Sequence, residues 1–439
     1  MFASKTTTIL RSTALAGALT LCAATTASAG EIRMLINQSP WLNSFITMVN
    51  AYEQESGNKI DLDVTPYGGM VEKTRNSLRS GTGQYDLIAL NAAALAEFYG
   101  GGYLEPLDKI DPNFKIGPNI LSFNHSTNWN AKTKAFGPNG ALLGAPINGN
   151  VQVLYYRKDL YEKKGLKVPQ TWAELEANAE ALHDDSTYGF VARGARDSIL
   201  YNFTSYMFSN GGSFFKDPSK GDYTVTINSP AGLKALETYI KLAKTTGPAN
   251  PGAVAQAELI QLLSTGRAAQ AIGVVAAYSN LNDPNSSIVA GKIGTALIPA
   301  APGQPHASAA GHWMAGIAKN VPEGNQKIAM NFLEWFLKKD QQMAYVKAGG
   351  VPVRSDLSEM SDSDPAFAFL PAFSENAKVA QMNMPLIQGV ELGDAVSLQL
   401  NKALIGEISP KEALNTAAHQ MQDILSKAGY KLTPPKDLK

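Results

Sequence analysis

The sequence contains a single cysteine, Cys22, among 439 residues. A disulfide needs two thiols, so the chain can form no internal disulfide bond, and its stability must come from the apolar area that it buries. Lipidation at Cys22 is not indicated either, because a lipoprotein signal needs a small residue before the cysteine and the chain has Leu21 there.

An excess of charge of either sign is also absent. Basic and acidic residues both number 38, which gives a formal net charge of zero. A surface that binds nucleic acid or an anionic membrane shows in a sequence as a basic excess. We therefore expect neither as a partner.

The sequence motifs of common enzymes are missing. The chain has no G-x-S-x-G, phosphate loop, dinucleotide fingerprint, H-E-x-x-H or C-x-x-C. The five histidines lack the spacing of metal ligands, and residues 283–294 resemble a calcium loop without its glycine and its final glutamate. We therefore expect no catalytic residue, no metal and no cofactor. Paired carboxylates leave no signature, so a secreted glycoside hydrolase stays open as an alternative.

Long apolar runs are absent after residue 29. Residues 1–29 carry Lys5 and Arg11, an apolar core over 14–24 and the small residues Ala27, Ser28 and Ala29, which is typical of a cleaved signal peptide. We expect a soluble, monomeric mature chain that begins near Gly30. The alternative is an N-terminal membrane anchor, which the short core, diluted by threonines, disfavours.

The length and the order of the elements predict a two-domain α/β protein. A chain of 439 residues exceeds the size at which one core stops growing. Residues 32–36, 60–64 and 85–90 read as strands, and a helix from Trp41 to Gly57 separates the first two. Strands that alternate with helices pair in parallel. We expect mostly parallel sheets flanked by helices.

Residues 144–175 predict a connection between the two domains. A turn over 146–150 precedes a β-branched and aromatic strand over 151–156, and a short helix then ends at Gly165. Thr171 and Glu174 form a capping box that begins the next helix. Further along the chain, apolar spacing predicts one long helix over 326–343, and Ser409 with Glu412 predicts a second capping box.

Residues 144–175 resemble the first interlobe crossover of the extracellular solute-binding proteins of carbohydrate ABC importers, the family that includes maltose-binding protein. The shared pattern is G-x-P at 144–146, L-x-Y-x-K-D-L at 154–160 and G-x-x-x-P-x-T-W-x-E at 165–174. Residues 103–107, 311–319 and 349–354 resemble further family segments in the same order.

The resemblance implies a two-lobe periplasmic binding protein fold with three interlobe crossovers. It implies a first lobe over 30–147 and 307–350, a second lobe over 148–306, and a C-terminal helical part over 351–439 that belongs mainly to the second lobe. It also implies a periplasmic protein that delivers a solute to the membrane permease subunits of the importer.

Aromatic and amide side chains at the predicted strand ends are the candidate ligand contacts. Ligands of open α/β sheets bind outside the carboxyl ends of strands. Sugars suit this mixture, because amides pair with hydroxyls and an aromatic face covers the apolar face of a pyranose. The strand ends supply Asn37, Gln38, Trp41, Tyr67 and Asn91, and the resemblance adds Asn148, Asn150, Arg193, Tyr278, His312, Trp313 and Arg354.

Each candidate has a structural alternative. Trp41 and Trp313 also suit a core, and Asn91 also suits a helix cap. Asn148 and Asn150 are ordinary turn residues. The two arginines, Arg193 and Arg354, are of a type that more often forms surface salt bridges.

Three classes of function follow. The first is a binding protein that closes two lobes on a sugar, polyol or glycoside, and we expect this class, with no enzymatic activity. The second is the secreted glycoside hydrolase. The third is an adhesin or envelope protein, for which no small molecule would raise the melting temperature.

Overall fold

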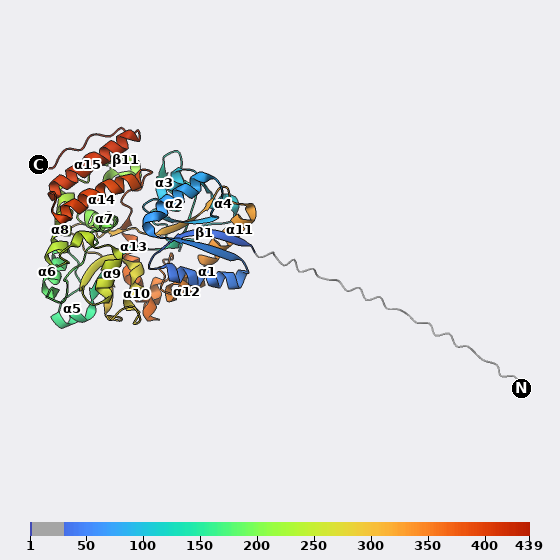
Figure 1. Ribbon diagram of the computed structural model, residues 1–439, viewed down its shortest axis with the longest axis horizontal. Helices are drawn as coiled ribbons and strands as arrows, with labels where there is room; N and C mark the ends of the chain where they lie inside the picture. Colours follow the sequence, from blue (N-terminus) through green and yellow to red (C-terminus); the bar gives the residue numbers. More distant parts are fainter. Residues whose placement is uncertain (2–29) are drawn as a thin grey trace.

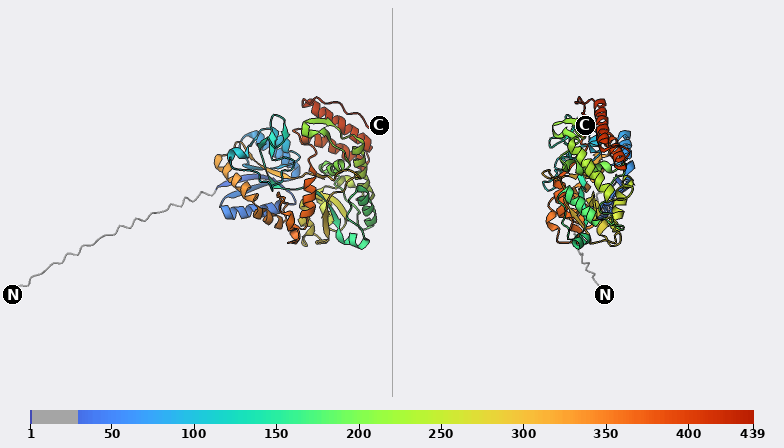
Figure 2. Two further views of the ribbon diagram at one scale, coloured as in Figure 1. Left: turned by 180° about the vertical axis from the view of Figure 1, so that it is seen from behind. Right: turned by 90° about the vertical axis from the view of Figure 1, so that its left-hand side faces the viewer.

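The computed structural model describes residue 1 and residues 30–439. The predicted signal peptide therefore lies outside the described residues, apart from its first. Figure 1 shows two lobes side by side, with α1–α4, α11 and α12 in the first lobe, and Figure 2 shows the same division from behind. Within the part of the chain that is described, no helix has both the length and the apolar character that a membrane span requires.

A six-stranded sheet forms the centre of the first lobe. Its order is β2-β1-β3-β15-β4, with β8 also paired to β15. β1 runs parallel to β2 and β3, whereas β15 runs antiparallel to β3, β4 and β8. The strands are β1 (Glu31–Asn37), β2 (Lys59–Thr65), β3 (Leu87–Asn91), β4 (Leu104–Glu105), β8 (Ala145–Asn148) and β15 (Trp313–Ala318).

The helices of this lobe bury aromatic side chains against the sheet. The helix α1 ends at Gly57, whose φ of 76° is the left-handed conformation that glycine adopts without strain. Phe45 of α1 packs against Phe332 and Phe336 of α11, at centroid distances of 5.8 and 5.6 Å. The helices are α1 (Leu42–Ser56), α2 (Tyr67–Ser80), α3 (Leu95–Gly100), α4 (Leu107–Ile110), α11 (Glu323–Phe336) and α12 (Lys339–Lys347).

The single helix predicted over 326–343 is wrong, because the chain breaks between α11 and α12. Lys338 is extended, with ψ of 148°. The side chain of Gln342 stabilises the break, because its amide donates to the carbonyl of Phe336 and accepts from the N–H of Val353, at 2.8 and 2.9 Å. A backbone carbonyl that the helix leaves unpaired is thereby satisfied.

The second lobe is built on an antiparallel sheet. Its strand order is β12-β9-β13, so parallel pairing in the central sheets is confined to the first three strands of the other lobe. The two-lobe α/β architecture is as predicted. The expected parallel pairing is not found in this lobe, because β12 and β13 both run antiparallel to β9. The strands are β9 (Gln152–Arg157), β12 (Gln270–Val274) and β13 (Ile293–Ala296), and a separate hairpin of β10 (Phe215–Asp217) and β11 (Asp222–Val225) packs on α15.

The helices of the second lobe include the last two of the chain. The predicted capping box at Thr171 and Glu174 begins α6, whereas Ser409 only accepts from the N–H of Glu412. α14 (Gly389–Ile405) and α15 (Pro410–Lys427) pack on each other and on helices of this lobe. The others are α5 (Lys158–Lys164), α6 (Trp172–Leu182), α7 (Ile199–Ser209), α8 (Pro230–Thr245), α9 (Gln256–Ser264), α10 (Tyr278–Asn282) and α13 (Leu370–Lys378).

The chain segments that connect the lobes lie side by side. Val151, between β8 and β9, bridges Ala310, and β14 (Ser308–Ala309) pairs in parallel with β16 (Ala380–Gln381). Gly149 also touches the segment that follows α12, since a Cβ there would lie 2.1 Å from the carbonyl oxygen of Pro352. Only glycine allows this approach.

Candidate ligand-binding site

The ends of four strands gather at one edge of the first-lobe sheet. Asn37 and Thr65 pair at the carboxyl ends of β1 and β2, and Tyr67 lies two residues beyond Thr65. Because β15 runs antiparallel to β3, its first residue, Trp313, pairs with the last residue of β3, Asn91. The first-lobe candidates therefore do share one edge of the sheet.

Three aromatic rings form a row at this edge. Trp313 lies between Trp41 and Tyr67, with ring centroids 5.9 and 6.2 Å away. Trp41 and Trp313 are 1% and 3% exposed, whereas Tyr67 is 45% exposed. Tyr67 is therefore the accessible end of the row. Ligand contact by either tryptophan stays a prediction, and it would require a movement that uncovers the indole.

Two buried oxygen atoms just after the end of β1, or at it, have no hydrogen-bond partner among the described residues. They are the Oδ1 atom of Asn37 and the Oγ atom of Ser39. The Nδ2 atom of Asn37 donates to the carbonyl of Gln38 at 3.1 Å, and the side chain of Gln38 is exposed. Ser39 was not among the candidates predicted from the sequence, although its place directly after a strand end was a usable signal. Buried polar atoms without partners are uncommon in folded proteins and indicate a missing partner.

The second lobe contributes a buried guanidinium. Arg193 is 8% exposed, and its Nε and Nη1 atoms have no partner among the described residues. The backbone of Arg193 is held by Asn202 and Tyr239, at 3.0 and 2.6 Å. Its guanidinium lies over the ring of Tyr201, with Cζ 5.4 Å from the centroid. Burial lowers the pKa of Arg193, an unfavourable environment for an unpaired charge.

Tyr201 and Tyr67 place this guanidinium where the lobes meet. The hydroxyl of Tyr201 donates to the carbonyl of Ala309 at 3.4 Å, beside the connection that leads to Trp313. Burial raises the pKa of Tyr67, and the positive charge of Arg193 opposes that rise. Tyr67 is 45% exposed, yet the charge of Arg193 in the other lobe still affects its pKa. Tyr201 was not among the predicted candidates, and its only signal in the sequence was the aromatic helix to which it belongs.

Asn148 and Asn150 hold the first connection in place. Asn148 is fully buried, donates to the hydroxyl of Tyr345 at 3.0 Å and accepts from the N–H of Asn150 at 3.0 Å. The Oδ1 atom of Asn150 accepts from the N–H of Ala276 at 3.2 Å. These bonds use the amide groups within the protein. The structural alternative for the two asparagines is thus favoured over ligand contact.

His312 is buried behind Trp313. Its ring stacks on Phe123 with centroids 4.5 Å apart, and its Nε2 atom lies 2.8 Å from the hydroxyl of Ser126. Burial lowers the pKa of His312 to about 3, so the ring is neutral at physiological pH. Its Nδ1 atom has no hydrogen-bond partner among the described residues, so ligand contact by His312 stays a prediction.

Three further candidates are engaged elsewhere. Arg354 donates to both carboxylate oxygens of Asp356, at 2.8 and 2.7 Å, and to the carbonyl of Leu337. The hydroxyl of Tyr278 donates to the carbonyl of Pro365 at 3.4 Å. Asn91 accepts from the N–H of Ala93 at 3.0 Å, a turn-capping bond. These hydrogen bonds lie within the protein, and ligand contact by the three side chains stays a prediction.

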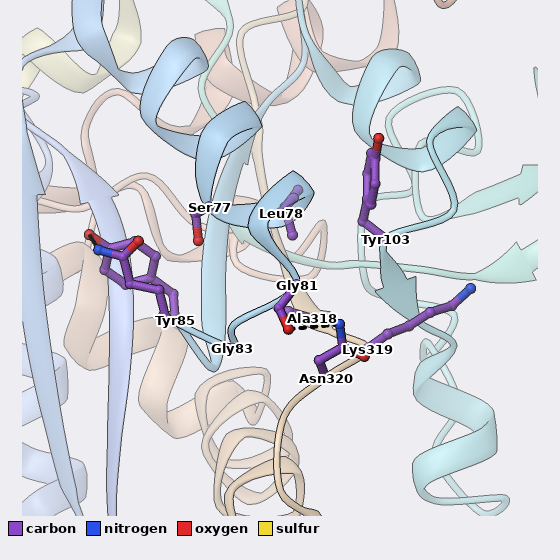
Figure 3. Close-up of a pocket in the computed structure, with 10 residues that line it drawn as sticks. Ser77, Leu78, Gly81, Gly83, Tyr85, Tyr103, Ala318, Lys319 and Asn320 are labelled. Atoms are coloured by element: carbon purple, nitrogen blue, oxygen red, sulfur yellow. Dashed lines mark hydrogen bonds between the residues drawn. The ribbon is translucent and has the colours of Figure 1, made fainter.

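A small cavity lies at the opposite edge of the first-lobe sheet (Figure 3). It is lined by the end of α2, by Tyr85 and Tyr103, and by Asn320, whose amide donates to the carbonyl of Gly81. Its volume of about 20 Å³ holds one water molecule and excludes a sugar. Over residues 30–439 no group of histidine, cysteine and acidic side chains is arranged to hold a metal ion.

Two α/β lobes joined by three connections, with unpaired polar groups where they meet, define a two-lobe binding protein. The family model "Bacterial extracellular solute-binding protein" matches residues 38–343. The chain therefore belongs to the bacterial extracellular solute-binding proteins, and the resemblance drawn from its sequence motifs is confirmed.

Relatives and solved structures agree with this membership. A putative binding protein of Brucella abortus is 27% identical, with 94% of this chain and 98% of the relative covered. The mannitol-binding protein of Pseudomonas aeruginosa is 25% identical, with 79% and 82% covered. The fold matches maltose-bound MalE3 of T. maritima with a TM-score of 0.77 at 22% identity, covering 90% of this chain and 100% of that one.

Proposed function

We propose that this protein is the solute-binding component of an ABC importer that takes up a sugar or polyol. The solute binds between the two lobes, and the closed protein delivers it to the membrane permease subunits. One observation carries the proposal: the buried guanidinium of Arg193 in the second lobe has no partner at Nε or Nη1 among the described residues, and it lies over Tyr201, which donates to the connection at Ala309. The names of the relatives, which include a mannitol-binding protein, support a polyhydroxylated solute.

The chemistry of the site suits such a solute. Asn37 and Ser39 offer acceptors and Arg193 offers donors, so hydroxyl groups can pair with both kinds of atom. The accessible ring of Tyr67 provides an apolar face for the C–H groups of a sugar ring or chain. These buried groups make the site specific. A solute that leaves one of them without a hydrogen bond binds less tightly than a solute that pairs with all of them.

Closure follows from the division of the site between two lobes. A solute that touches both lobes binds the closed form more tightly than the open form, and only this difference shifts the equilibrium. The adjacent connections at Val151, Ala310 and Ala380 provide the place at which the lobes turn. Hinged closure around a ligand is the motion of periplasmic binding proteins.

The same proposal includes export and a non-catalytic role. The protein acts in the periplasm as a monomer after removal of residues 1–29, and it releases its solute unchanged. The family and the relatives reported above are binding proteins, and the described residues bear no observation that favours the glycoside hydrolase alternative.

The test is calorimetric titration of the mature protein with sugars, polyols and sugar acids, together with small-angle scattering with and without the solute that binds. We expect micromolar or tighter binding of one member and a smaller radius of gyration on binding. Failure of every member to bind, or binding without compaction, would contradict the proposal. Sustained release of product from a glycoside would contradict its non-catalytic part.

A further inference from the structure

Arg193 departs from the pattern set by the other partly or fully buried arginines. Arg75, Arg157 and Arg354 each donate two hydrogen bonds to one carboxylate, those of Glu97, Asp159 and Asp356. Arg157 is the closest comparison, because Arg157 and Arg193 are both 8% exposed. At equal burial, one guanidinium has a bidentate carboxylate and the other has none within the described chain.

The missing partner has a large energetic consequence. A buried charge without a counter-charge is destabilising, and a second charge with matching hydrogen bonds offsets that destabilisation. The planar guanidinium presents donors in a fork that fits the two oxygens of a carboxylate or phosphate. The contact between Arg193 and the Tyr201 ring supplies only a weaker, unforked attraction.

The surroundings place Arg193 near a connection between the two lobes. The ring of Tyr201 lies against the guanidinium and its hydroxyl donates to the carbonyl of Ala309 in the connection, while the charge of Arg193 acts on Tyr67 of the first lobe. The neighbouring carboxylates, Asp197 and Asp394, act on this cluster only over longer distances, and both are exposed. Water screens them, so their repulsion of an anion is small beside a direct ion pair.

We propose that the solute of this protein carries an anionic oxygen group, a carboxylate, sulfonate or phosphate, on its sugar or polyol skeleton, and that Arg193 binds this group through Nε and Nη1. The inference rests on the proposed function and adds the charge of the solute to it. The anionic group of the solute would then pair with Arg193 as the carboxylate of Asp159 pairs with Arg157.

The experiment compares matched probes on matched variants. The probes are glucose, glucuronate and glucose 6-phosphate, galactose and galacturonate, mannitol and mannonate, and a sulfonated hexose. The variants are Arg193→Met and Arg196→Met. Arg196 is the control, since it lies three residues away, is exposed and lines an open groove between α14 and α15.

We expect an anionic probe to bind the unmodified protein at least about 10-fold more tightly than its neutral counterpart. Arg193→Met should lower the affinity for that probe by about 30- to 1,000-fold, as removal of one partner of a buried ion pair does. Arg196→Met should change it by less than about 3-fold, as expected for an exposed charge. The probe that binds most tightly distinguishes carboxylate, sulfonate and phosphate.

A second measurement does not depend on knowing the solute. Sulfate raises melting temperatures of proteins in general, so the informative quantity is the extra rise in the unmodified protein over Arg193→Met at equal ionic strength. We expect an extra rise that Arg196→Met retains.

Tighter binding of a neutral probe than of its acid, or equal sulfate responses in the unmodified protein and Arg193→Met, would overturn this inference and leave the proposed function standing. Failure of all neutral and anionic probes to bind would overturn both.

Discussion

The phenol ring of Tyr67 meets the indole of Trp313 edge-on, with the centroids 6.2 Å apart and the ring planes at 76°. One ring of the pair is 45% exposed and the other is 3% exposed. The contact therefore joins a residue available to a solute with one that supports it from behind. Substitutions at the two positions should have different effects.

Tyr67→Ala should weaken solute binding by about 10- to 30-fold, because it removes the accessible aromatic face from the site. The melting temperature without solute should change little, since the ring is half exposed. Calorimetric titration and thermal unfolding of the same sample check both parts. Tyr67→Phe is the control and should keep most of the affinity; unchanged affinity in Tyr67→Ala would remove this ring from the site.

Trp313→Ala should destabilise the protein by about 3–5 kcal/mol, because a buried indole leaves a cavity between Trp41 and the sheet. Chemical denaturation of the solute-free protein measures this loss, and Trp313→Phe should lose less. A variant with unchanged stability and strongly reduced affinity would instead show that the indole contacts the solute directly.

Asn148→Ala should lower the free energy of unfolding by about 1–3 kcal/mol, because it leaves the Tyr345 hydroxyl and the Asn150 N–H buried without partners. Tyr345→Phe removes only one of the two bonds, and a double-mutant cycle isolates their coupling. Denaturant midpoints of the four proteins provide the measurement. Additive losses would show that the bond between Asn148 and Tyr345 contributes nothing.

The buried ring of His312 should make stability fall in acid. Its pKa is lowered to about 3 in the folded protein, so between about pH 6.5 and pH 3 the unfolded chain binds a proton at His312 and the folded chain does not. This stabilising contribution is complete above about pH 6.5, the pKa of the unfolded chain, and it is lost as the pH falls toward 3. His312→Gln should lose less stability than the unmodified protein between about pH 7 and pH 4 in equilibrium denaturation. Parallel curves for the two proteins would contradict the burial of a neutral ring.

Arg354→Ala should leave solute affinity unchanged, because all the hydrogen bonds of its guanidinium are to Asp356 and Leu337. The expected effect is a loss of about 1 kcal/mol in stability, typical of a partly exposed ion pair. Asp356→Asn should behave in the same way. A loss of solute affinity greater than about 10-fold in Arg354→Ala would show that Arg354 contacts the solute.

Much of the fold could be predicted because its signals are local. The alternation in 60–64, the stop at Gly57 and the capping box at Thr171 all lie within a few residues of the structure they specify. The break at Lys338 escaped prediction because it contains neither glycine nor proline. It depends on Gln342, whose amide reaches a carbonyl six residues back and an N–H eleven residues ahead.

The candidate site was predictable only where strand order decides position. Asn37 and Tyr67 follow from parallel pairing of β1 and β2, since parallel strands end at one edge. Arg193 was placed by resemblance, while its lack of a carboxylate partner is a property of three-dimensional packing and has no signature in the chain. The engagement of Arg354, by contrast, could have been anticipated from Asp356 two residues away.

The central strand β15 has a consequence for biosynthesis. It is formed by residues 313–318, yet it pairs with β3, β4 and β8, which precede it by about 170 to 230 residues. A nascent chain that has emerged only as far as β13 carries the β3 and β8 edges without their partner, and open strand edges invite intermolecular pairing. The first lobe, although synthesised first, is therefore the later of the two to complete its sheet, since the sheet of the second lobe is complete at β13.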